Sequence, residues 1–335
     1  MDLTAQPEAV HLPTAGTPED SGCAVGTLTA VLILMVLIPA WVVGLFDLPV
    51  IQTWAVVFVA VCLQALPFLV FGVVLSAAIT AFVPPSVFSK MLPRRPALAV
   101  PVAGAAGAIL PGCECASVPL AGGLIARGVT PAAAFAFLLS APAINPVVLT
   151  ATAVAFPGHP EMVAARLVAS LATAVVMGWG WLRFGRPEWL RPPRRPSVDG
   201  QTGRWETFRA AMQHDFLHAG GFLVVGGLTA ATLNVVVPRS VIQALAGVPW
   251  ISVLVLALLA VVLAICSEAD AFVAASLTGF SLTARLAFLV VGPMVDVKLI
   301  ALQSGTFGRA FAVRFSAATF AVAAASSLLV GWWLL

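Results

Sequence analysis

The sequence predicts an all-α, polytopic membrane protein made of two internal repeats, inverted relative to each other, with broken or re-entrant helices and one extra transmembrane helix in front. Three observations predict this fold class. Of 335 residues, 61% are hydrophobic and 9% are charged, whereas a soluble domain carries about a quarter charged residues. Apolar runs long enough to span about 30 Å of hydrocarbon recur along the chain. The third observation is an internal duplication.

Two stretches of the chain are diverged copies of each other. Residues 68–87 (FLVFGVVLSAAITAFVPPSV) align without a gap with residues 222–241 (FLVVGGLTAATLNVVVPRSV). The same shift places residues 112–116 (GCECA) over residues 266–270 (CSEAD). A duplicated apolar unit with polar breaks at matching positions is typical of secondary transporters, whose substrate site lies between the repeats.

The repeats set the domain organisation. Residues 1–24 are polar and are predicted to be a disordered tail. Residues 25–46 lack a preceding basic region, so we expect an uncleaved first transmembrane helix rather than a signal peptide. Residues 52–184 form repeat 1 and residues 205–335 form repeat 2. The intervening residues 185–204 are rich in Pro and Arg and predict a flexible cytoplasmic loop.

Eight spans are expected within the repeats. They are Trp54–Val83, Ala97–Ala126, Pro131–Phe156, Met162–Phe184, Phe208–Val237, Ile251–Gly279, Thr283–Gly305 and Arg309–Leu335. The basic loop around Lys90 and the basic loop 185–204 should both be cytoplasmic, although three spans separate them. A re-entrant 97–126 segment, interrupted by Pro111-Gly112, removes the conflict and leaves each repeat with an odd number of crossings. The repeats are then inverted; if every span crosses, they are parallel.

Four acidic residues lie in apolar surroundings and are candidate substrate-binding residues: Glu114, Glu268 and Asp270, which would supply charge or proton coupling, and Asp296. Each costs about 2.5–3.5 kcal/mol at the centre of a membrane helix, so each should face protein or water. Glu114 and Glu268 coincide in the two repeats. If they meet, their charges repel and one of them holds a proton, as a proton-coupled transporter requires. The alternative is a buried ion pair, such as Asp296 with Lys298 or Arg285.

Cys113 and Cys115 lie in the same helix break as Glu114. In extended backbone, side chains two residues apart point the same way, so both thiols can reach one ligand. In a continuous helix they would diverge by about 200°. Paired thiolates select soft ions such as Zn²⁺, Cu⁺ and trivalent arsenicals, which makes these two residues candidate metal ligands. Cys266 could add a third sulfur, whereas the alternative is that the cysteines are small packing residues.

A second helix break is expected at Asn145, which lies between Pro142 and Pro146. Its counterpart in the second repeat is Asp296, which follows Pro293. Interrupted membrane helices expose carbonyl groups and half-helix ends that can coordinate ions, so both residues are candidates to line the substrate path. The alternative is a kinked helix in which Asn145 binds the loosened backbone.

Several function classes are excluded. The chain contains no phosphate-binding loop, ATPase signature or nucleophile elbow, so we expect neither an enzyme nor a cofactor. The net charge of +3 is too small to indicate nucleic acid. The expected partners are the lipid bilayer, a small inorganic or organometal(loid) substrate and protons.

Residues 111–149 (PGCECASVPLAGGLIARGVTPAAAFAFLLSAPAINPVVL) resemble the bacterial predicted-permease family that includes the organoarsenical efflux permease ArsP. Residues 266–277 and 286–299 resemble the second half of that family. The resemblance implies a multi-pass permease of the bacterial inner membrane that exports a thiol-reactive metal or metalloid. The Cys-x-Cys position of the family corresponds to Cys113 and Cys115. Glu114 stands where other members carry Ser, which leaves a divalent metal open beside arsenicals.

Two other functions remain open at this stage. A membrane thiol-disulfide oxidoreductase would use Cys113 and Cys115 as its redox pair, although their ring would be small and strained. A channel or scaffold subunit would act only within a larger transport complex.

Overall fold

The computed structural model describes residues 48–82, 93, 95–109, 114–191, 204–236 and 249–335. The predicted tail 1–24, the predicted first helix 25–46 and Cys113 lie outside these residues. The chain divides into residues 1–52 and residues 53–335, and the description below concerns the second unit.

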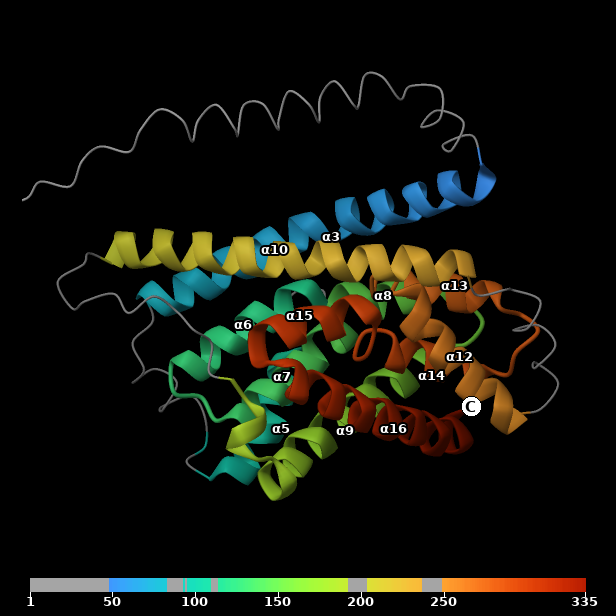
Figure 1. The fold of residues 1–335 in the computed structure, drawn as a ribbon. Coiled ribbons are helices and arrows are strands. Elements are labelled where there is room, and N and C mark those ends of the chain that lie inside the picture. The colour runs from blue at the N-terminus through green and yellow to red at the C-terminus, as the bar shows by residue number, and fades with distance from the viewer. Residues whose placement is uncertain (1–47, 83–92, 94, 110–113, 192–203, 237–248) are drawn as a thin grey trace, which may run out of the picture. The chain divides into compact units, whose positions relative to one another are not determined.

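The described elements are all helices, which confirms the all-α class. Their order along the chain, shown in Figure 1, is α3 (Pro49–Phe82), α5 (Pro96–Ala106), α6 (Glu114–Ala126), α7 (Pro131–Ile144), α8 (Pro146–Ala155), α9 (Glu161–Phe184), the 3₁₀ helix η1 (Pro187–Trp189), α10 (Arg204–Val236), α12 (Pro249–Leu263), α13 (Asp270–Ser276), α14 (Leu282–Val291), α15 (Val297–Phe307) and α16 (Arg309–Leu334).

Within the described part of the chain, four helical segments are long and apolar enough to cross a membrane. They are α3, the combined segment Pro131–Ala155, α9 and α16. Several shorter apolar helices accompany them. The length and composition of these helices are those of a multi-pass membrane protein.

Two of the helix breaks have a local cause. Pro146 disfavours helical backbone at the residue before it, and Asn145 is extended with a ψ of 157°, so α7 ends and α8 begins there. In the second half, α12 stops at a non-helical stretch that begins with Ala264. The φ of Ala264 is 49°, a left-handed conformation that costs a residue with a Cβ about 1–2 kcal/mol. Short half-helices therefore replace four of the long spans that hydropathy alone predicts.

The long helices α3 and α10 run antiparallel, side by side (Figure 1). Near the start of α3, the Trp54 indole Nε1 donates to the hydroxyl of Thr232, near the end of α10, at 3.0 Å. Near the other end, Phe82 of α3 lies 5.9 Å from Phe208 of α10, measured between ring centroids. Contacts at both ends fix the relative direction of the two helices.

Glycines let these long helices approach the half-helices closely. A Cβ atom built on Gly72 of α3 would lie 2.4 Å from the Cα of Ala116 in α6. A Cβ atom built on Gly226 of α10 would lie 2.8 Å from the Cα of Lys298 in α15. Both distances are too short for a real side chain, so glycine permits the close approach at these two positions.

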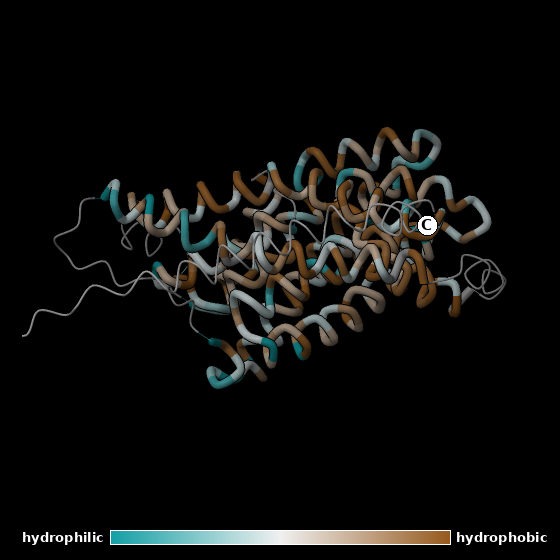
Figure 2. Tube along the Cα trace, turned by 45° about the horizontal axis from the view of Figure 1, so that its top comes forward, coloured by the Kyte–Doolittle hydropathy of each residue, from teal (hydrophilic) through white to brown (hydrophobic). Residues whose placement is uncertain are grey.

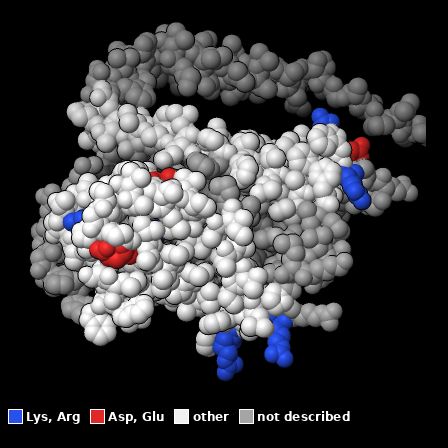
Figure 3. Space-filling view, turned by 180° about the vertical axis from the view of Figure 1, so that it is seen from behind, with Lys and Arg blue, Asp and Glu red and all other residues white. Residues whose placement is uncertain are grey.

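Polarity is distributed as in a membrane protein rather than a soluble one. Hydrophobic residues extend along most of each helix (Figure 2), and the face in Figure 3 carries charged residues only at isolated places. On α3, Val56 and Leu63 are 67% and 66% exposed. At the end of α16, Trp332 and Trp333 are exposed, as is common for Trp at a membrane interface. The charged side chains described below are instead buried among the helices.

The start of the predicted flexible loop 185–204 is ordered. Residues 187–189 form η1, and the backbone N–H of Arg191 donates to the carbonyl of Phe307 at 2.9 Å. The guanidinium of Arg314 in α16 lies over the Trp189 ring, 4.7 Å from its centroid. The expectation of a flexible loop is therefore wrong for residues 185–191, because a sequence rich in Pro and Arg does not reveal stacking on a distant helix. Residues 192–203 lie outside the described part.

Candidate functional site

The half-helix ends bring two buried ion pairs together in the interior. In sequence order their acidic members begin α6 and α13, and their basic members come from α9 and α15. The half-helix α6 packs against α15, and α13 packs against α8, so each pair joins the earlier part of the chain to the later part.

The first ion pair joins Glu114 and Lys298, both within 1% of complete burial. The Lys298 ammonium donates to Glu114 Oε1 at 2.7 Å. Glu114 is the first residue of α6, where the partial positive charge of the helix N-terminus favours a carboxylate.

Asp296 is the second carboxylate beside Lys298. Its Oδ2 lies 3.5 Å from the ammonium of Lys298, and its Oδ1 accepts from the backbone N–H of Leu299 at 2.6 Å. Asp296 is therefore the N-cap of α15 and a partner of Lys298 at once. The expected contact of Asp296 with Lys298 exists, but Glu114 is nearer. The alternative pairing with Arg285 is wrong, since Arg285 Nε donates to the carbonyl of Phe280 at 3.1 Å.

The second ion pair joins Arg166 of α9 and Asp270 of α13. The guanidinium donates to both carboxylate oxygens of Asp270, at 2.9 and 2.8 Å. It also donates to the hydroxyl of Thr152 at 2.9 Å and to the carbonyl of Ser267 at 3.4 Å. This bidentate geometry is among the strongest arrangements that a charged pair can adopt.

Cys266 and Cys115 flank the first ion pair. Both thiols are free and buried. Lys298 Nζ lies 3.9 Å from Cys266 Sγ. Cys115 is also close enough to Lys298 and to Cys266 to interact with both electrostatically. The structure thus brings Cys266 to the neighbourhood of Cys115, whereas Cys113 lies outside the described residues and its pairing with Cys115 stays a prediction.

Glu268 lies in the non-helical stretch between α12 and α13 and is partly buried. Its carboxylate interacts electrostatically with Glu114, Arg166 and Lys298. Glu114 and Glu268 are therefore near enough to influence each other, although the hydrogen-bonded partner of Glu114 is Lys298. A cation between carboxylates reduces the repulsion that two acidic residues alone would create.

Asn145 occupies at α8 the place that Asp296 occupies at α15. Its Oδ1 accepts from the backbone N–H of Val148 at 2.9 Å, and its Nδ2 donates to the carbonyl of Ala141 at 3.1 Å. Asn145 is buried, and its side chain connects the end of α7 to the start of α8. Whether it also lines a substrate path stays a prediction, and these bonds are those of the kinked-helix alternative.

Some buried polar atoms near the first pair have no hydrogen-bond partner. They are Glu114 Oε2, Asp296 Oδ2 and the hydroxyl oxygen of Ser267. Among the described residues, no three His, Cys, Asp or Glu side chains are grouped closely enough to hold a metal ion. Any metal held at Cys115 therefore needs a ligand from outside this set, such as Cys113.

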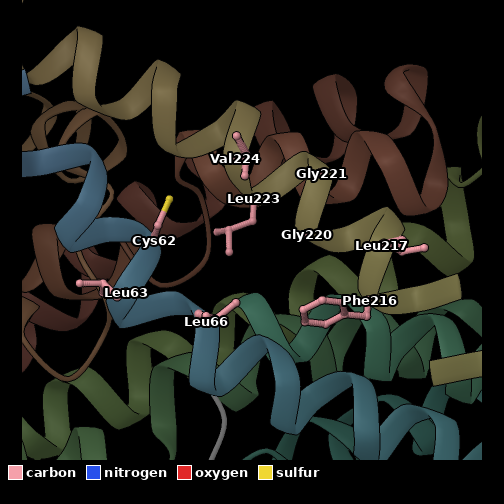
Figure 4. Close-up of a pocket in the computed structure, with 9 residues that line it drawn as sticks. All are labelled: Cys62, Leu63, Leu66, Phe216, Leu217, Gly220, Gly221, Leu223 and Val224. Carbon is pink, nitrogen blue, oxygen red and sulfur yellow. The ribbon is translucent and has the colours of Figure 1, made fainter. Parts of the chain in front are cut away.

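An apolar cavity of about 320 Å³ lies between α3 and α10 (Figure 4). Cys62 and Leu66 of α3 and Phe216 and Val224 of α10 are among its lining residues. None of the charged residues described above lines it. Cys62 therefore lines this apolar cavity rather than the charged cluster, although it is close enough to Cys115 to interact with it electrostatically.

Sequence reasoning missed Arg166. Acidic residues in apolar runs indicated the site, whereas Arg166 is a basic residue near the start of the span 162–184. The available signal was an Arg in an apolar helix, which should pair with one of the intramembrane acids. Thr152 was also missed, because an isolated Thr in a helix more often binds its own backbone. Here its hydroxyl donates to the carbonyl of Val148 and also accepts from Arg166.

Comparison with known proteins agrees with this architecture. Residues 50–332 match the family ArsP_1, described as a predicted permease. The UPF0718 protein YcgR of Bacillus subtilis (strain 168) is 33% identical over 82% of this chain and 95% of its own length. A putative two-component membrane permease complex subunit of Streptococcus mutans is 29% identical over 82% of this chain and 94% of its own length. No solved structure matches the chain. The resemblance expected from residues 111–149 is confirmed, and the chain belongs to the predicted permease family.

Proposed function

We propose that this protein is a secondary permease of the bacterial inner membrane that exports a small, soft metal or metalloid species through a site between two inverted repeats. The observation that carries the proposal is the buried Glu114–Lys298 pair, which lies beside Cys115 and Cys266 and joins half-helices from both parts of the chain. Half-helix ends that meet at polar residues are where secondary transporters bind their substrates.

Several features support two inverted repeats. A long helix begins each proposed repeat, and these two helices, α3 and α10, are antiparallel. Gly72 and Gly226 occupy matching positions in the duplicated sequence, and each allows a close approach to a half-helix. Asn145 and Asp296 also match, and each caps the second helix of a broken pair.

The buried thiols of Cys115 and Cys266 support the proposal that the cargo is a soft, thiol-binding species. Cys115 is fully buried and Cys266 is 2% exposed, so neither is open to a large partner protein. Burial disfavours a thiol-disulfide oxidoreductase, whose redox pair must be reached by a partner thiol. A small thiophilic species that enters the interior can reach them, with Cys113 as a further sulfur ligand.

The carboxylates and Asn145 have separate roles in this proposal. Glu114 and Glu268 supply the negative charge of the site, and a proton gradient supplies the energy. Asp296 and Asn145 line the path at the helix breaks. Asp270 holds Arg166 and maintains the structure around the site.

Uptake into everted membrane vesicles tests the proposal. Arsenite, methylarsenite and zinc are offered to vesicles that contain the wild type, Cys113→Ser or Cys115→Ser. Cys62→Ser is the matched control, because Cys62 lines the apolar cavity between α3 and α10, whose lining includes none of the ion-paired residues. We expect uptake of one cargo class to be lost in both site variants and kept in the control. Uptake that is unchanged in both site variants would remove the thiols from the mechanism.

A second candidate function is a channel or scaffold subunit of a larger complex. The printed name of the Streptococcus mutans relative, a subunit of a two-component membrane permease complex, favours it. Purified protein reconstituted alone in liposomes distinguishes the candidates. Cargo transport by the protein alone supports the complete permease, and transport that appears only with membrane extract supports the subunit.

A further inference from the structure

The cluster around Lys298 contains more carboxylates than cations. Glu114 and Asp296 are both fully buried, and they share one ammonium, which lies 2.7 Å from the first and 3.5 Å from the second. Glu114 Oε2 and Asp296 Oδ2 have no hydrogen-bond partner. Buried carboxylate oxygens normally have partners, so the cluster has unfilled capacity for one more positive group.

The geometry also gives Lys298 two alternative positions. The side chain of Lys is flexible and carries a compact charge, so the ammonium can move between two acceptors that are already within 4 Å. Asp296 stays in place when this happens, because its Oδ1 caps α15 through the N–H of Leu299. No comparable freedom exists at Arg166, whose planar guanidinium is held by both oxygens of Asp270.

We propose that Lys298 is an internal substitute for a cationic cargo. In the structure its ammonium pairs with Glu114; when a metal cation binds Glu114 beside the thiols, the ammonium moves to Asp296. This inference rests on the proposed permease function and narrows its substrate class. The cargo that Lys298 controls is positively charged, so a soft divalent metal fits the site better than neutral arsenite.

The neighbouring groups are consistent with this exchange. Cys115, Cys266, Glu268 and Asp270 are the other titratable groups that interact electrostatically with Glu114 or Lys298. None of them is a second cation. Arg166 is bound to Asp270. From α10, Gly226 contacts Lys298 only at its backbone and brings no charge to the cluster. In the described part of the chain, Lys298 is therefore the cation that a bound metal must displace from Glu114.

Two variants are expected to act in opposite directions. Lys298→Met removes the competing charge and should tighten zinc binding by about tenfold or more, because two like charges at close range repel strongly in a buried site. Asp296→Asn removes the second acceptor, so the ammonium stays on Glu114 and zinc binding weakens by about tenfold. The asparagine should keep the cap of α15, since Asn145 caps α8 with the same group.

Isothermal titration of the purified wild type and variants with Zn²⁺ measures both effects. Lys298→Gln repeats the first arm with a polar side chain in case Lys298→Met does not fold. Glu161→Gln is the control, because Glu161 is exposed and paired with His159. Damage to the fold would weaken binding in both site variants, so weaker or unchanged binding in Lys298→Met and Lys298→Gln overturns the proposal.

Two further arms separate this inference from the proposed function. Binding of phenylarsine oxide, which is neutral, should not change in Lys298→Met, and a tenfold change would contradict charge competition. Cys115→Ser tests the thiols independently. If Cys115→Ser binds zinc like the wild type while the Lys298 and Asp296 variants behave as expected, the charge exchange holds and the thiol-based cargo site fails.

Discussion

The two buried ion pairs differ in how completely their charges are satisfied. Arg166 donates to both oxygens of Asp270 and also to Thr152 and Ser267. Lys298 has one short contact, to Glu114, and one longer contact, to Asp296. The difference teaches that burial alone does not make a charge functional. The Arg166–Asp270 pair, whose carboxylate is saturated although Arg166 Nε has no partner, holds helices together. The Lys298 pair, whose carboxylates keep unpartnered oxygens, can exchange partners.

Removal of Arg166 should give the largest effect. Arg166→Ala leaves Asp270 buried without its partner, a change that costs about 3–5 kcal/mol in folded proteins. We expect little folded protein in fluorescence-detected size-exclusion chromatography and a strongly lowered unfolding temperature. Arg166→Ala/Asp270→Ala should be more stable than Arg166→Ala, because the uncompensated charge is gone. If the double variant unfolds at the same temperature as Arg166→Ala, the uncompensated charge of Asp270 is not the cause of the instability.

Removal of Lys298 should be less damaging to stability. Lys298→Met leaves Glu114 and Asp296 without their cation, but two neighbouring carboxylates can relieve their repulsion by taking up one proton between them, so we expect a loss of about 1–3 kcal/mol. Thermal unfolding in detergent, compared with Arg166→Ala under the same conditions, measures the difference. Equal losses at the two sites would contradict the distinction between a saturated and an exchangeable pair.

A methyl group added at Gly226 should disturb the Lys298 ion pair, because it would press on the backbone of α15. In Gly226→Ala the new methyl would lie 2.8 Å from the Cα of Lys298, so α10 or α15 must shift. Overpacking of this kind costs about 1–3 kcal/mol, and it should also alter transport because it displaces Lys298. Gly220→Ala is the matched control, since nothing lies within 4 Å of its added methyl. Transport in Gly226→Ala equal to that in Gly220→Ala would show that α15 tolerates the displacement.

The smallest effects should come from the helix caps. Asn145→Ala removes the cap of α8, and such losses cost about 1 kcal/mol. Asp296→Ala removes the cap of α15 and a partner of Lys298, so it should also change zinc binding. Unfolding temperature and zinc affinity, measured in parallel, separate the two roles. If Asn145→Ala alters zinc affinity as much as Asp296→Ala, Asn145 belongs to the cargo site as well.

Several site features could be predicted from local patterns. Pro146 and the acids within apolar runs located the breaks and the charged positions, because a proline or a carboxylate in such a run has few structural options. Arg166 could not be identified in the same way. Its partner Asp270 is far away in the sequence, and a basic residue near a helix start is equally compatible with the membrane interface.

The sequence by itself determined that this chain is helical and apolar on the outside, that its helices break at Asn145 and near Glu114, and which permease family it belongs to. These properties depend on hydrophobicity, proline geometry and short motifs, all of which act locally. Only the tertiary structure decided that Glu114 pairs with Lys298 and Asp270 with Arg166. The choice of partner depends on how helices from distant parts of the chain pack, and a buried charge accepts whichever opposite charge that packing brings within hydrogen-bonding distance.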